Sequence, residues 1–214
     1  MSEETQVILN DKKNNDLKNI FINYKKTLIV LISVVFISLF SYFFYTDYKK
    51  GIKQKISEKY NLALINFNID NPNKSIIEMK NIINKKDPTY APLALYFLLD
   101  NNLLKNKIEI NQYFDILIND IKLDKEIKNL IIYKKGLYNS DFANEEELLN
   151  IFNPLLRNEN LWTTHSLYVI AEYFFSKGEK QKSREFFEKL IETDNSNPQL
   201  KIEAQKRLQR DFGD

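Results

Sequence analysis

One stretch near the start of the chain is apolar without interruption. From Thr27 to Tyr45 the sequence reads TLIVLISVVFISLFSYFFY, nineteen residues without a charge, a proline or a glycine, and lysines stand on both sides. A helix of that length would be roughly 28 Å long, close to the roughly 30 Å hydrocarbon core of a bilayer. The pattern predicts a short polar tail (1–26), a transmembrane anchor (27–46) and a domain outside the membrane (47–214).

The sequence around this run favours an uncleaved anchor over a secretory signal. The 26 residues that precede it include Glu3, Glu4, Asp11 and Asp16 as well as lysines. The run ends in the aromatic residues 42–45, which suit a membrane interface, and no A-x-A-like cleavage site follows. A buried core helix is the other alternative, and it would need a protein large enough to surround it.

The rest of the chain is periodic at about 36 residues. Predicted first helices begin near Lys53, Thr89, Lys125, Trp162 and Pro198, at spacings of 36, 36, 37 and 36. Apolar residues recur at the same interval, as in the sets Ile77, Tyr113, Leu149 and Phe186, or Ile82, Ile118, Leu155 and Ile191. The period predicts an all-α fold in which about four helix hairpins stack as an α-solenoid and a C-terminal helix follows.

Residues at the predicted boundaries agree with this arrangement. Gly178 stands where the end of a helix calls for a left-handed residue. Asn144 precedes three glutamates and is a predicted N-cap, with acidic residues in the first turn. The pairs 87–88 and 197–198, Asp-Pro and Asn-Pro, mark loop-to-helix boundaries.

The segment 167–198 resembles a tetratricopeptide repeat. Its first-helix, turn and second-helix positions hold Leu167, Ile170, Ala171, Phe174, Gly178, Ser183, Phe187 and Leu190. Earlier units depart from the pattern: Asn101, Asn102 and Asn139 fall near turns where glycine is usual, and small residues are missing at several close-packing positions. We expect irregular crossing angles in those units.

The chain contains NYKKTLIVLISVVF, then FFYTDYKKGIKQKISEKYNLAL, then divergent repeats. From Asp16 onward, this layout resembles that of the YfgM-like ancillary subunits of the SecYEG translocon. The repeat domain of that family is related to the periplasmic cell-division coordinator CpoB. The resemblance implies a single-pass protein of the bacterial inner membrane, with a cytoplasmic tail and a periplasmic repeat domain. It also implies contact with the translocon, with periplasmic chaperones and with newly exported proteins.

The charges beside the anchor do not decide its orientation. Five lysines precede the run within about fifteen residues and five follow it, so the positive-inside rule gives no preference. A cytoplasm-facing scaffold with the opposite orientation therefore stands as a second hypothesis. A third, in line with the CpoB relation, is a periplasmic envelope or cell-division structural factor.

Composition and the search for chemistry favour protein binding over catalysis. The 31 basic and 29 acidic residues give a net charge of +2, so nucleic acid binding has little support, and without cysteine there are no disulfides or thiolate sites. His165 has no second histidine and no nearby Ser/Asp constellation, and residues 145–147 point around a helix rather than converging on a metal. We therefore expect no enzyme activity, no cofactor, no metal site and no small-molecule substrate.

Four aromatic residues are the candidates for partner binding: Tyr60, Tyr96, Tyr133 and Trp162. The three tyrosines recur at 36 and 37 residues on first helices, which line the concave face of tetratricopeptide solenoids. Each of them has an alternative role in the core. For Trp162, a hot spot of an interface competes with a packing staple between repeats beside Leu161, which is the simpler interpretation.

Overall fold

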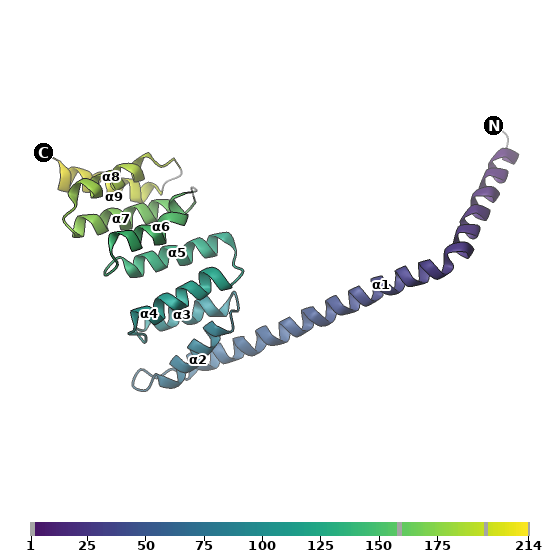
Figure 1. Cartoon of the computed structure of the whole chain (residues 1–214), viewed down its shortest axis with the longest axis horizontal. Helices are drawn as coiled ribbons and strands as arrows, with labels where there is room; N and C mark the ends of the chain where they lie inside the picture. Colours follow the sequence, from purple (N-terminus) through teal and green to yellow (C-terminus); the bar gives the residue numbers. More distant parts are fainter. Residues whose placement is uncertain (1–2, 158–159, 195–196, 214) are drawn as a thin grey trace. The chain divides into compact units, whose positions relative to one another are not determined.

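The computed structural model describes residues 3–157, 160–194 and 197–213, and these residues form helices and connecting turns without a β-strand. The helices are α1 (Glu3–Ile65), α2 (Asn73–Asn84), α3 (Tyr90–Asp100), α4 (Lys107–Asp115), a π-helical turn η1 (Ile116–Asp120), α5 (Lys125–Asn139), α6 (Glu145–Leu156), α7 (Thr163–Ser176), α8 (Lys180–Glu192) and α9 (Pro198–Phe212) (Figure 1). The predicted all-α class is confirmed.

The chain divides into two units, Met1–Lys55 and Ile56–Asp214. In the first unit, α1 carries a segment that is long and apolar enough to span a membrane. Every large apolar side chain from Ile29 to Tyr45 is exposed. This exposure argues against the alternative of a core helix, because such a helix would be covered by the protein itself.

Four of the five predicted helix starts hold. Helices α3, α5, α7 and α9 begin within one residue of Thr89, Lys125, Trp162 and Pro198. The predicted start near Lys53 is wrong, because α1 continues through that residue to Ile65. No proline interrupts this stretch, and Lys, Gln, Glu and Ile sustain a helix, so the single Gly51 does not end it.

The predicted capping residues take the expected conformations. The Asn144 side chain accepts from the backbone N–H of Glu147, whose carboxylate in turn accepts from the Asn144 N–H, which completes a capping box. Gly178 has φ +78°, as predicted for the turn between α7 and α8. Asn102 has φ +52° and therefore takes the left-handed conformation usually given to glycine.

Within the second unit, each hairpin shares its core with the next one along the chain. One buried cluster joins the end of α1 with α2, α3, α4, η1 and α5, the second joins α5, α6 and α7, and the third joins α7, α8 and α9. Helices in contact follow the chain order for α2 with α3, α4 with α5, α5 with α6, α6 with α7, and α7 with α8, and α9 packs against both α8 and α7 (Figure 1). The largest fully buried side chains include Phe114, Phe152, Phe174 and Phe187.

One close helix crossing occurs twice, 108 residues apart, which is three periods of 36. The buried Ser75 hydroxyl donates to the carbonyl oxygen of Ala63 at 2.9 Å. The buried Ser183 hydroxyl donates to the carbonyl oxygen of Ala171 at 2.8 Å. Serine and alanine are small enough to let the two helices of each hairpin approach this closely, and the hydrogen bond satisfies the buried hydroxyl.

Gly136 is a position at which the domain should not tolerate a larger side chain. A Cβ at this position of α5 would overlap the ring of Phe152, which is fully buried in α6. We expect Gly136→Ala to lower the free energy of unfolding by about 1–3 kcal/mol, because overpacking outweighs the gain of roughly 1 kcal/mol in helix propensity. Thermal denaturation followed by circular dichroism tests this.

Gly51→Ala is the matched control, since Gly51 is also helical but its Cβ would meet nothing within 4 Å. Its unfolding midpoint should not fall. An unchanged midpoint for Gly136→Ala would contradict the packing described here.

Candidate functional site

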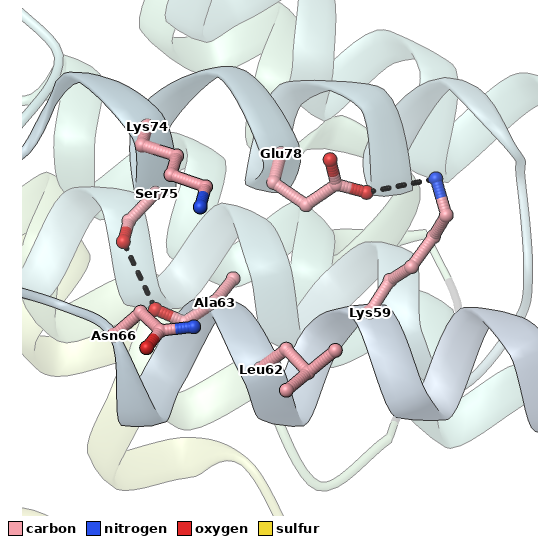
Figure 2. Close-up of a pocket in the computed structure, with 7 residues that line it drawn as sticks. All are labelled: Lys59, Leu62, Ala63, Asn66, Lys74, Ser75 and Glu78. Atoms are coloured by element: carbon pink, nitrogen blue, oxygen red, sulfur yellow. Dashed lines mark hydrogen bonds and ion pairs between the residues drawn. The ribbon is translucent and has the colours of Figure 1, made fainter.

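An open groove lies between the last turns of α1 and the start of α2, both in the second unit (Figure 2). Its volume is about 190 Å³. The lining residues are Lys59, Leu62, Ala63, Asn66, Lys74, Ser75 and Glu78. We call this surface the first-hairpin groove.

The floor and one wall of the first-hairpin groove are held by polar contacts. The floor is the crossing at which Ser75 donates to Ala63. Toward one end, the Lys59 ammonium group lies 3.1 Å from a carboxylate oxygen of Glu78, which joins the two helices (Figure 2). These contacts join α1 to α2, and none of the helices that the structure describes lines the groove besides these two.

Two lining side chains lack comparable contacts. Leu62 immediately precedes the core residue Ala63 on the same helix, yet it is 56% exposed. Lys74 makes no ion pair within the described part of the chain, and its ammonium group lies over the space between the two helices (Figure 2). The groove thus offers one apolar contact and one cation.

The first hairpin also exposes other large aliphatic side chains. Ile65 and Ile69 are each 78% exposed, and Ile77 is 61% exposed. Ile77 belongs to a set of apolar residues that recurs with the period, yet its counterpart Tyr113 is buried. Helix α2 therefore turns this position to solvent.

The predicted tyrosines Tyr60 and Tyr96 are half-buried at the edge of the first core cluster. The Tyr60 ring lies 5.6 Å from that of Tyr90, and the Lys134 ammonium group lies 4.4 Å above the Tyr96 ring. Burial raises the pKa of both phenols, helped by Tyr90 at the first and by the Asp100 carboxylate at the second.

Tyr133 and Trp162 are brought together, and His165 joins them. The Tyr133 and Trp162 rings stack at 5.2 Å, while the His165 ring lies 5.8 Å from Tyr133 and 5.4 Å from Trp162. Burial raises the pKa of the Tyr133 phenol. Trp162 therefore packs between α5 and the start of α7, whereas Leu161 is 71% exposed. The contact surface of Trp162 is the face of α5, in the preceding hairpin.

A second groove, which sequence reasoning missed, runs along α4, α5 and α6 and has a volume of about 620 Å³. The carboxamides of Asn111 and Asn139 pair in it reciprocally, at 3.0 and 2.9 Å. Asn139, expected near a turn where glycine is usual, is the last residue of α5, where it is buried and also donates to the Lys135 carbonyl oxygen. No spacing pattern in the sequence relates these two asparagines, so the pair could not be identified from the sequence.

The other polar residues singled out in the sequence have structural partners. Glu145 pairs with Lys182 of α8 at 2.7 Å, Glu147 completes its capping box, and the His165 ring nitrogen Nδ1 lies 3.2 Å from the Leu161 carbonyl oxygen. No group of three His, Cys, Asp or Glu side chains that could hold a metal ion is found among the described residues.

Comparison of the chain with protein-family models, curated proteins and solved structures gave no match. Function is therefore inferred from the apolar segment of α1, the packed helices and the surfaces described above.

The aromatic contact between Tyr133 and Trp162 has a direct optical readout, because Trp162 is the single tryptophan of the chain. We expect Tyr133→Ala to shift the tryptophan emission to longer wavelength, since water reaches the indole. It should also lower the free energy of unfolding by about 0.5–1.5 kcal/mol for the lost aromatic pair, and further for lost apolar burial.

Tyr60→Ala removes a half-buried tyrosine that packs elsewhere, so it should leave the emission unchanged. Equal spectra for the two variants would contradict a stacking role for Trp162.

Proposed function

We propose that this protein is a single-pass membrane protein that presents a tetratricopeptide-repeat-like α-solenoid as a docking surface for other proteins. The observation that carries the proposal is the first-hairpin groove, with its exposed aliphatic neighbours, on a hairpin whose first helix also carries a segment apolar enough to span a membrane. Large aliphatic side chains cost free energy in water, and their exposure in one segment is typical of an interaction surface.

The repeated crossing supports the tetratricopeptide-like part of the proposal. The same serine-to-alanine hydrogen bond recurs after three periods, and helices α3, α5, α7 and α9 begin 35, 38 and 35 residues apart. Repeats of two helices that contact only their neighbours form solenoids, and solenoids act as binding surfaces.

The proposed partners are the SecYEG translocon, periplasmic chaperones and exported proteins, with the tail in the cytoplasm and the helical domain in the periplasm of a bacterium. This part rests on the resemblance of the anchor and its flanks to YfgM-like subunits. A membrane-anchored domain is confined near the bilayer, which favours encounter with a membrane-embedded partner through raised effective concentration.

Orientation is tested with reporter fusions after Asp214. We expect alkaline phosphatase to be active and green fluorescent protein to be dark, because only the former folds productively in the periplasm. Fusions after Lys25, ahead of the apolar segment, are the matched control and should give the reverse pattern. A fluorescent Asp214 fusion would overturn the periplasmic orientation in favour of a cytoplasm-facing scaffold.

Partner identity is tested by photo-crosslinking in intact cells. A photoreactive residue is placed in turn at Leu62, Leu137 and Ile202, which are exposed on α1, α5 and α9, so the result does not depend on one surface. We expect mass spectrometry to recover translocon subunits or periplasmic chaperones. Irradiation after solubilisation in denaturing detergent should abolish these adducts. Recovery of only division or cell-wall proteins would instead support the envelope-factor hypothesis.

A further inference from the structure

The first-hairpin groove has a counterpart inside the stack. Hairpin α7/α8 repeats the Ser–Ala crossing of hairpin α1/α2 after 108 residues, so the same shift relates the residues around each crossing. The related pairs are Leu62 with Ile170, Asn66 with Phe174, Lys74 with Lys182, and Glu78 with Phe186.

In hairpin α7/α8 this surface is covered by α6. Ile170 and Phe174, both almost fully buried, share a core cluster with Leu148 and Phe152 of α6. At the edge of the same contact, the Lys182 ammonium group donates to both carboxylate oxygens of Glu145, the first residue of α6, at 2.9 and 2.7 Å. At this interface, α6 is therefore an amphipathic helix: its apolar face is buried against hairpin α7/α8, and its acidic first turn pairs with a lysine of α8.

The first hairpin keeps the two features that recognise such a helix. Leu62 stands in the position of the buried Ile170 and is exposed, and Lys74 stands in the position of Lys182 without an acidic partner. Asn66 and Glu78 stand in the positions of the stacked rings of Phe174 and Phe186. The uncovered groove is therefore more polar and can face water when no helix is bound to it. That composition is typical of a transient interface, whereas the interface of a permanent complex is more apolar.

We propose that the first-hairpin groove binds an amphipathic helix of a partner protein, with an acidic residue in its first turn, in the pose that α6 takes on α7/α8. The acidic residue pairs with Lys74, and apolar residues one and two turns later cover Leu62. This inference deepens the proposed docking function and rests on it: it names the chemistry of the partner and the surface that receives it.

The probe is a fluorescein-labelled peptide of residues 144–157, which contains α6 with its capping box. Binding is measured by fluorescence anisotropy to the full chain in lipid nanodiscs, with empty nanodiscs to subtract adsorption to lipid. We expect saturable binding that Lys74→Glu weakens at least about tenfold, because an attraction becomes a repulsion, and that Leu62→Gln weakens comparably.

A charge exchange makes the test specific to this pose. The peptide carrying Glu145→Lys should bind the Lys74→Glu protein more tightly than it binds the unchanged protein, which restores the pair with reversed signs. Lys206→Glu, on the exposed side of α9, makes the same change in net charge and should leave binding unaltered. Circular dichroism melting of each variant checks that the domain remains folded.

Absence of saturable binding, or binding that neither Lys74→Glu nor Leu62→Gln alters, would overturn the proposal. The second result would mean that the peptide replaces α6 in its own site or binds elsewhere, and that the groove is only a polar end of the stack. Neither result bears on the crosslinking experiment, because adducts at Leu137 or Ile202 would still support a docking scaffold.

Discussion

The structure depends on the fact that a helix hairpin has no core of its own. Each apolar face is buried only where a neighbouring helix covers it, and the three core clusters are each shared between successive hairpins. Stability is thus distributed along the chain as a series of interfaces between neighbours. A face without a neighbour must be polar or be covered by a helix of another protein. The first hairpin combines polar residues in its groove with the exposed apolar Leu62, which a partner helix could cover.

The two ends of the described stack differ in how they meet this requirement. At the far end, α9 lies over α7 and α8, where Arg207 pairs with Glu172 of α7 at 2.6 Å and its guanidinium lies 4.5 Å from the centre of the Phe175 ring. A planar, bidentate cation suits this edge because it joins a carboxylate and an aromatic face at once. The first hairpin has no such covering helix among the described residues, so its groove stays open.

Much of the fold could be predicted because helix ends carry their own chemistry. Asn144, Gly178 and Pro198 each have a local conformational reason for their position, so they mark boundaries without knowledge of the tertiary structure. The start near Lys53 was wrong because no such residue stands there and the period alone suggested it. The groove could not be predicted, since Leu62 has the same spacing and type as Ile170. Only the structure distinguishes a covered position from an open one.

The length of α1 has a consequence for the order of folding. Its last turns supply Ile56 and Ala63 to the first core cluster, whose buried residues extend no farther along the chain than Ile131. Contacts between segments so close in sequence require little loop closure, so they form quickly. As the chain emerges from the ribosome, the hairpins can therefore assemble one after another onto an existing helical end, and each new pair finds its binding surface already in place.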